Sequence, residues 1–375
     1  MNHNTEEQNA YQAQIFSNRL AKKYKNLRKW ARRERITCYR LYDRDIPEVP
    51  LAVDLYEFLP DGMDSKIECA KFLRIEYARI SNNELSATKE KSLRQFVHLY
   101  LYERPYEKSD EDEQIWLNEM KKAISKTLEI PQNHIIQKFR KRQKGENQYE
   151  KIDSKATTEG FVQEYGQLFK VNLSDYIDTG LFFDHRPLRK IVRETCAGKS
   201  VLNLFCYTAS FSVYAAEGKA SRIESVDLSN TYLDWAKFNI ALNDFNPDDR
   251  RFVFTKGDVT GFLNQKLAEV PNKEKSNRYD LIILDPPTFS NSKATRNTLD
   301  INRDWAELVK KCINLLNPNG ILYFSTNSHR LKFDENAIPN ISSYSTIIKV
   351  TDLTEKSLPE DFKGSKAHRL WKIEI

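Results

Sequence analysis

The chain has 375 residues, of which 40% are hydrophobic and 30% charged, the balance of a globular protein long enough for two domains. This composition excludes a disordered chain, and no apolar run approaches the roughly 20 residues that a membrane-spanning helix needs. The polar N-terminus lacks the apolar segment of a secretory signal, and the five scattered cysteines favour a reducing cytoplasm over a disulfide framework or a zinc site. We therefore expect a cytoplasmic protein without a metal.

The net charge of +6 is uneven along the chain. Residues 1–155 carry 30 Lys/Arg against 25 Asp/Glu, whereas the remainder carries 29 against 28. A helix is predicted over Ile15–Arg35, because apolar residues recur on one stripe and nine Lys/Arg lie between them. We take residues 1–36 as a basic N-terminal helix whose cations are candidates for contact with RNA phosphates: Lys22, Lys25, Arg28, Lys29 and Arg32.

A small α/β domain is predicted over residues 37–155. Its elements are β-favouring runs at Cys38–Tyr42, Leu51–Phe58 and Phe96–Tyr102, an amphipathic helix at Asp112–Leu128, and a basic strand or hairpin at Ile135–Tyr149. The last segment supplies four more candidate RNA contacts: Arg140, Lys141, Arg142 and Lys144. A charge run is more often only a solvated face, but two such runs in one small domain favour an RNA-binding domain.

A change of pattern marks the C-terminal half. Residues 156–178 are predicted to form a hairpin linker, because Phe161–Leu173 alternates around Gly166. Over residues 179–375, short apolar strands then alternate with helical segments: Ser200–Leu204, Ile223–Val226, Phe252–Phe254, Leu281–Leu284 and Ile321–Ser325. This order predicts a mostly parallel sheet covered by helices on both faces, with a ligand beyond the carboxyl ends of the strands.

The residues at those strand ends favour a nucleoside cofactor without a pyrophosphate. No glycine lies between Asn203 and Glu217, so the first loop cannot approach a pyrophosphate, which disfavours a nicotinamide dehydrogenase. Asp227 follows the second strand, where a carboxylate can accept both hydroxyls of a ribose, and Asp258 follows the third. Either acid could instead be only a helix cap or a turn residue.

The fourth strand runs into Asp285-Pro286-Pro287-Thr288-Phe289. Two prolines cannot continue a central strand, so they fix a rigid loop at the sheet edge. The aromatic residue that follows could stack on a base, or could be an ordinary core side chain. This loop is the strongest candidate in the chain for the reaction site.

The order N-L-F-x-Y-T, V-D, G-D and D-P-P-x-F resembles class I S-adenosylmethionine-dependent methyltransferases. More narrowly, the chain resembles the bacterial 23S ribosomal RNA guanine-N7 methyltransferase, usually the C-terminal half of the ribosomal large subunit methyltransferase K/L. The stretches that carry this likeness are Lys29–Ala31 with Cys38–Asp43, Arg142–Tyr149, Thr179–Arg186 and Leu284–Lys293, and it extends from about residue 15 onward.

The resemblance implies a Rossmann-like domain with a seven-stranded, mostly parallel sheet, preceded by the basic helix and the RNA-binding domain. It implies S-adenosylmethionine as cofactor and large-subunit ribosomal RNA as substrate. The departures from the pattern are Cys206 in place of Ser, Ala209 in place of Gly, and an insertion of roughly 30 residues near 61–91. No second methyltransferase half is present, so a guanine-N2 methyltransferase or helicase-like partner would be a separate polypeptide.

The resemblance also implies roles for the residues at the strand ends. Asp184 and Arg186 would start the helix before the first strand, with Arg186 pairing with the methionine carboxylate of the cofactor. The implied catalytic residues are Asp285, Pro286, Pro287 and Phe289. The full implied cofactor-binding set is Phe183, Asp184, Arg186, Asn203, Phe205, Tyr207, Thr208, Asp227, Leu228, Asp258, Val259 and Asp285.

The residues also restrict the methylated atom. Methylation of a pyrimidine carbon-5 needs a nucleophilic cysteine. None lies in Phe324–Ser328, where related enzymes place it, and Cys206 and Cys312 are expected to be packing residues. A nitrogen target is left. Guanine N7 needs no general base, but an exocyclic amine such as guanine N2 would use the same loop. A catalytically silent RNA-binding or ribosome-assembly protein is the alternative outside enzymology.

Overall fold

The computed structural model describes residues 3–63, 65–104, 106, 108–139, 157–269, 278–290, 298–338 and 348–375. The chain forms two compact units, Met1–Thr179 and Gly180–Ile375. The N-terminal helix, the small α/β segment and the predicted hairpin all fall in the first unit. Among the described helices, none is both long and apolar enough to cross a membrane.

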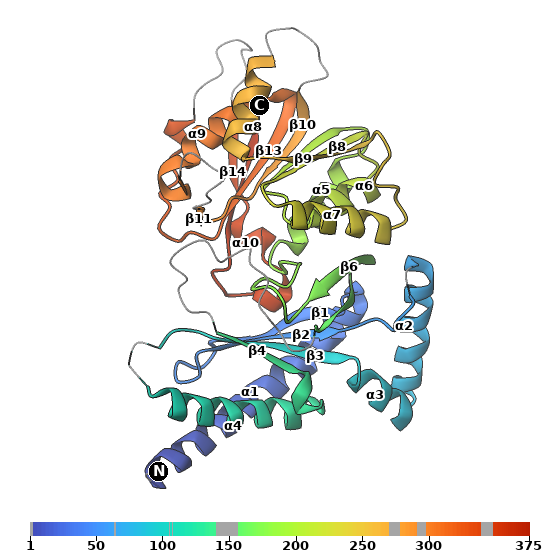
Figure 1. Cartoon of the computed structure of the whole chain (residues 1–375), viewed down its shortest axis with the longest axis vertical. Helices are drawn as coiled ribbons and strands as arrows, with labels where there is room; N and C mark the ends of the chain where they lie inside the picture. Colours follow the sequence, from blue (N-terminus) through green and yellow to red (C-terminus); the bar gives the residue numbers. More distant parts are fainter. Residues whose placement is uncertain are drawn as a thin grey trace. The chain divides into compact units, whose positions relative to one another are not determined.

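The first unit is built on a four-stranded sheet in the order β1-β2-β3-β4. Neighbouring strands are antiparallel except β3 and β4, which are parallel. Helices α1 and α4 lie together on one face of this sheet (Figure 1). The elements are α1 (His3–Glu34), β1 (Cys38–Asp43), β2 (Leu51–Glu57), β3 (Gln95–Leu101), α4 (Asp110–Leu128) and β4 (Ile135–Phe139).

The apolar stripe predicted from the sequence fixes α1 in this unit. Phe16, Leu20, Leu27 and Ala31 are buried in one core with Trp116 of α4, whose indole nitrogen donates to Gln12 at 2.7 Å. The cations between these positions are exposed, except Lys23, which is half-buried beside Asp45. The helix therefore shows the amphipathic pattern expected of it, and burial of its apolar face, about 1.5–3 kcal/mol for each large side chain, holds it against the sheet.

The expected insertion near residues 61–91 contains two helices, α2 (Lys66–Ser81) and α3 (Leu85–Ser92), between β2 and β3. The hairpin predicted around Gly166 is present as β5 (Glu159–Glu164) and β6 (Gln167–Asn172), which pair antiparallel. Gly166 has a φ of +87°, which favours glycine at this turn.

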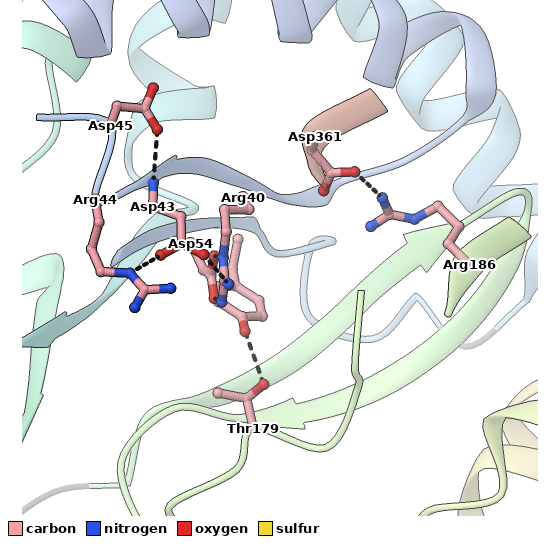
Figure 2. Close-up of polar contacts among 9 residues, drawn as sticks. Arg40, Asp43, Arg44, Asp45, Asp54, Thr179, Arg186 and Asp361 are labelled. Carbon is pink, nitrogen blue, oxygen red and sulfur yellow. Dashed lines mark hydrogen bonds and ion pairs between the residues drawn. The ribbon is translucent and has the colours of Figure 1, made fainter. Parts of the chain in front are cut away.

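A buried ion pair links the first two strands of this sheet. Arg40 of β1 donates to both carboxylate oxygens of Asp54 on the neighbouring strand, at 2.7 and 2.9 Å, and to Asp43 at 3.2 Å (Figure 2). Burial opposes the charge of Arg40, but Asp54 and Asp43 raise the pKa of this guanidinium well above its usual value. The sheet thus buries a bidentate ion pair, the strongest geometry available to arginine and a carboxylate.

The second unit contains the expected seven-stranded sheet, in the order β14-β15-β13-β10-β7-β8-β9. The five strands from β13 to β9 are parallel, and β15 and β14 add antiparallel pairs at one side. Its strands are β7 (Ser200–Leu204), β8 (Arg222–Asp227), β9 (Phe252–Lys256), β10 (Tyr279–Leu284), β13 (Leu316–Thr326), β14 (Lys349–Asp352) and β15 (Arg369–Glu374).

Helices cover both faces of this sheet (Figure 1). Those on one side are α5 (Arg186–Thr195), α6 (Ser210–Glu217) and α7 (Asn230–Leu242), and those on the other are α8 (Val259–Glu269) and α9 (Ile301–Asn314). The chain starts at the central strand β7, proceeds to β8 and β9, and then crosses to β10. In parallel sheets ligands bind where the strand order reverses in this way, so the loops after β7 and β10 mark the site.

Candidate active site

The loop after β7 adopts a strained backbone without any glycine. Phe205, Tyr207 and Ala209 have φ values of +54°, +52° and +57°, a region that residues with side chains rarely occupy and that costs about 1 kcal/mol or more for each. Side chains from outside the loop hold its middle. The Thr208 hydroxyl donates to the Gly180 carbonyl at 2.7 Å, and Asn239 donates to the Thr208 carbonyl at 3.0 Å. Such strain is typical of functional sites, where surrounding contacts compensate for it.

Asp227, at the end of β8, faces this loop. Its two carboxylate oxygens accept from the backbone amides of Tyr207 and Ser229, each at 2.9 Å. Burial raises the pKa of Asp227, and these amide contacts only partly oppose that effect. The cap of helix α7 is Ser229, whose hydroxyl accepts from the Tyr232 amide. Asp227 is therefore not needed as the helix cap, and its oxygens keep acceptor capacity for further donors.

Four other residues of the expected cofactor set are already engaged in packing or in hydrogen bonds within the second unit. Asn203 is buried and its amide donates to Ser212 at 2.9 Å, while Phe183 and Val259 are buried core side chains. Asp258 accepts from the Gly261 amide at 2.9 Å in the first turn of α8, so its side chain has the capping contact that the alternative interpretation expected. Of the neighbouring candidates, Phe205, Tyr207 and Leu228 are half-buried and Thr208 is buried.

The D-P-P loop begins where β10 ends. Asp285 accepts a hydrogen bond from the Ser325 hydroxyl at 2.6 Å, which ties it to the end of the adjacent strand β13. Pro286 is buried and Pro287 half-buried. Phe289 is 54% exposed and lies in β11 (Phe289–Ser290), which pairs with β12 (Leu299–Asp300). The interpretation of Phe289 as a core aromatic is therefore wrong, and its ring is accessible for stacking.

A histidine lies between two carboxylates beside this loop. His185 Nε2 is 3.3 Å from Asp285 Oδ2 and 3.9 Å from Asp184 Oδ2. Burial alone would lower the pKa of His185, but Asp285 and Asp184 outweigh it and raise the value to about 9. Burial likewise opposes ionisation of the two acids, yet His185 holds the pKa of each below its usual range. The three groups are thus mutually stabilised in their charged forms.

A second histidine completes this cluster. The ring of His368 stacks on His185 with centroids 4.4 Å apart. Its Nδ1 lies 2.9 Å from Asp184 Oδ2 and its Nε2 lies 2.8 Å from the Ser357 hydroxyl. Asp184, His185 and His368 offer ligand atoms within 4.8 Å of one another, a spacing that a metal ion could use. Both nitrogens of His368 are already within hydrogen-bonding distance of protein partners, so hydrogen bonds account for the arrangement.

Two arginines at the start of α5, Arg186 and Arg189, form contacts next to the Asp184–His185 segment. Arg186 is fully buried, and its Nη1 lies 2.8 Å from Asp361, which is also buried (Figure 2). Arg189 donates to the Phe182 carbonyl at 2.8 Å. The helix starts at Arg186, as the sequence implied. The structure shows Arg186 as a buried partner of Asp361, and its contact with a cofactor carboxylate stays a prediction.

The candidate RNA-binding residues of the first unit lie on the exposed side of α1, where Lys22, Lys25, Arg28, Lys29 and Arg32 all face solvent. Arg32 also donates to Ser81 at 3.0 Å and lies over the Tyr77 ring, so α2 engages part of it. The second candidate group, Arg140, Lys141, Arg142 and Lys144, lies outside the described residues.

Comparison with known proteins agrees with this geometry. The family model described as S-adenosylmethionine-dependent methyltransferase matches residues 98–337. The chain belongs to this methyltransferase family. It is 40% identical over 96% of its length to ribosomal RNA large subunit methyltransferase K of Neisseria meningitidis serogroup B, and covers 86% of that protein. It is 39% identical over 96% of its length to ribosomal RNA large subunit methyltransferase K/L of Pseudomonas aeruginosa.

The chain spans only 42% of this K/L relative. Two solved structures share the fold across 97% of the chain. A proposed methyltransferase in complex with SAH has a TM-score of 0.67 at 21% identity, over 82% of that chain. A proposed SAM-dependent methyltransferase from Streptococcus mutans has a TM-score of 0.66 at 22% identity, over 81% of that chain. The class I methyltransferase fold expected from the sequence is therefore confirmed.

S-adenosylmethionine is the cofactor of this family, and the strand-end residues suit it. Asp227 offers a buried carboxylate whose partners are backbone amides, which matches the need of a ribose diol for acceptors. The loop beside it lacks the glycines that let a backbone approach a pyrophosphate closely. The bound methyltransferase cofactor supplies an electrophilic methyl group, and the protein has to hold the acceptor atom in line with it.

The sequence did not single out several residues of this site. His185 stands within the quoted G-L-F-F-D-H-R block and is adjacent to Asp184, which was the one local signal for it. Ser325, His368 and Asp361 are brought to the site by contacts across 40, 184 and 175 positions of the chain. No local spacing points to such contacts. The cysteines expected to be packing residues are buried free thiols, as are the other three.

Proposed function

We propose that this methyltransferase acts in the cytoplasm on large-subunit ribosomal RNA and transfers the methyl group of S-adenosylmethionine to N7 of a guanine. The observation that carries the proposal is the 40% identity, over 96% of the chain, to a protein named ribosomal RNA large subunit methyltransferase K. The exposed cations of α1 support an RNA substrate, since lysines and arginines neutralise backbone phosphates without reading sequence.

In the proposed reaction, Asp285 and the two prolines orient the target base, while the exposed ring of Phe289 stacks on it. Asp285 accepts from Ser325 and lies beside His185, and its pKa is held below the usual range. A carboxylate of this kind binds N–H donors well but takes up a proton poorly. Guanine N7 carries no proton and reacts through its lone pair, so a site without an effective base suits this atom.

Guanine N2 is the second candidate, because an amine could donate to Asp285 through the same loop. Its methylation leaves a proton to be removed, which Asp285 is less suited to accept. We further propose that a guanine-N2 methyltransferase or a helicase-like protein acts beside this chain on the same RNA. A silent RNA-binding role is disfavoured by the assembled Asp184, Asp227 and Asp285 sites.

The test uses large-subunit ribosomal RNA from a strain lacking this gene, incubated with the purified full chain and labelled cofactor. Mass spectrometry of the digested nucleosides should reveal 7-methylguanosine. A different methylated nucleoside would overturn the N7 assignment while leaving an RNA methyltransferase. Cofactor binding without incorporation into naked or ribosome-bound RNA would contradict the proposed substrate, and a failure to bind the cofactor would favour a silent protein.

A further inference from the structure

In the buried cluster beside the D-P-P loop, two carboxylates share one imidazole. Two carboxylates, Asp184 and Asp285, face one imidazole, that of His185, whose Nε2 lies 3.9 and 3.3 Å from them. The opposite oxygen of Asp285 is held by Ser325 at 2.6 Å. Both carboxylate oxygens of Asp285 are therefore held, one by Ser325 of β13 and the other by His185, which precedes α5.

We propose that His185 is a positioning residue of the methyl-transfer site, which fixes the Asp285 carboxylate in the orientation that receives the target base. This inference rests on the role of Asp285 in the proposed function. His185 itself is only 6% exposed, and it is reached from the site through Asp285. It therefore acts through that carboxylate and need not touch the RNA.

His368 supports His185 in turn. The two rings stack at 4.4 Å with an interplanar angle of 17°, and His368 is anchored between Asp184 and Ser357 at 2.9 and 2.8 Å. The resulting chain of contacts runs from Ser357 through His368, Asp184 and His185 to Asp285 and Ser325. These residues come from the segment before α5, from α10 (Thr354–Ser357), from the end of β13 and from the residue preceding β15. The cluster therefore ties the D-P-P loop to two strands of the sheet and to two segments outside it.

The charge of His185 depends on every group that faces it. Asp184 and Asp285 favour its protonated form, while Arg189 on α5 opposes it, and the packed faces of His368 and Phe211 exclude water. The two acids prevail and raise the pKa of His185 to about 9. Nε2 therefore carries a proton for Asp285 below this pH. Deprotonation above it removes the positive charge that holds the carboxylate, so turnover should fall as the pH rises through about 9.

The experiment compares His185→Gln and His185→Leu with the wild-type full chain, at saturating cofactor and RNA. Glutamine keeps an N–H donor but does not titrate, whereas leucine has neither property. His185→Leu should lower kcat by about 100-fold, the usual cost of a misplaced reacting group, and His185→Gln should restore a substantial part of it. The wild type should lose activity above pH 9, and the glutamine variant should not. His134→Gln in the first unit is the matched control and should keep the wild-type profile.

Guanine itself loses a proton in alkaline solution, which would lower the activity of every variant. The pH profile of His185→Gln measures this effect alone, because its glutamine does not titrate. An alkaline loss of the same size in wild type and His185→Gln would overturn the proposal, as would equal kcat values for the leucine and glutamine variants. The nucleoside product is identified in the same reactions, so a product other than 7-methylguanosine would refute only the N7 assignment.

A measurement without turnover keeps the inference testable if His185→Leu does not fold or if no RNA is methylated. Nuclear magnetic resonance of the histidine rings should assign His185 a pKa near 9, which Asp285→Asn should lower by at least about one unit, since it removes one of two neighbouring charges. A wild-type His185 that titrates near its ordinary value, or an Asp285→Asn chain with the same His185 pKa, would refute the coupling between the two side chains.

Discussion

The two units of the protein both bury charged side chains against a sheet, but they balance the charges differently. In the sheet of the first unit, buried charges form pairs of opposite sign, as in Arg40 with Asp54 and Lys91 with Glu57. The second unit also contains a matched pair, Arg186 with Asp361. At its strand ends, however, Asp184 and Asp285 share His185, and Asp227 is held by backbone amides. A matched pair leaves little capacity for a ligand, whereas an unmatched carboxylate keeps acceptors available.

This difference separates charges that stabilise the fold from charges that prepare a site. It also explains why burial alone is a poor guide to function here, since Asp54 and Asp227 are both largely buried acids at strands. The partner of each acid decides its role. Variants in the two units should therefore fail in different ways.

Asp285→Ala should lower methyl transfer by about 1000-fold while the chain stays folded, because it removes the carboxylate that we propose orients the base. Single-turnover kinetics with saturating RNA and cofactor provide the measurement. Asp248→Ala, at an exposed position of the same unit, is the matched control. If Asp285→Ala turned over within a few-fold of that control, Asp285 would not orient the base. The proposed difference between the two units would then be wrong.

Arg40→Ala should lower the free energy of unfolding of the first unit by about 3 kcal/mol, because it leaves the largely buried Asp54 without its bidentate partner. Urea unfolding followed by tryptophan fluorescence measures the loss. Cofactor affinity, a property of the second unit, should be unchanged. The double variant Arg40→Met with Asp54→Leu should regain most of the stability, and a double variant as unstable as Arg40→Ala would show that the loss does not come from the unpaired carboxylate.

The extent to which sequence predicted this molecule follows from the range of the interactions. The five parallel strands of the C-terminal sheet and the stripe on α1 were predicted correctly, because hydrophobic periodicity is a local property. Strand ends also located Asp227 and Asp285 at one edge of the sheet, since parallel strands share that edge. The clusters around them were not predictable, because His368 and Asp361 meet Asp184 and Arg186 only after the chain has folded.

Asp227→Ala should weaken S-adenosylmethionine binding by about 30-fold, which corresponds to about 2 kcal/mol, the scale of hydrogen bonds to a charged acceptor. Calorimetry measures the affinity. The raised pKa of Asp227 adds a pH dependence: its protonated form accepts fewer hydrogen bonds, so affinity should fall as the pH is lowered through that pKa. Asp227→Asn should bind with an affinity that is independent of pH in this range. A wild-type affinity that does not vary with pH would contradict a charged ribose acceptor.

Replacing Lys22, Lys25 and Lys29 together with Ala should have the smallest effect, about a tenfold loss of RNA affinity at moderate salt. These side chains are exposed on α1, opposite its buried stripe, so the fold should be retained. Three lost phosphate contacts should make the plot of log affinity against log salt shallower by about two units.

The matched control replaces Lys121, Lys122 and Lys126 of α4, in the same unit, and should keep the wild-type slope if α1 is the RNA-binding face. Equal slopes for both triple variants would mean that the first unit attracts RNA only through its total charge. A wild-type slope for the α1 variant, together with a shallower one for Arg140, Lys141 and Arg142 replaced by Ala, would transfer the contact to that second basic run.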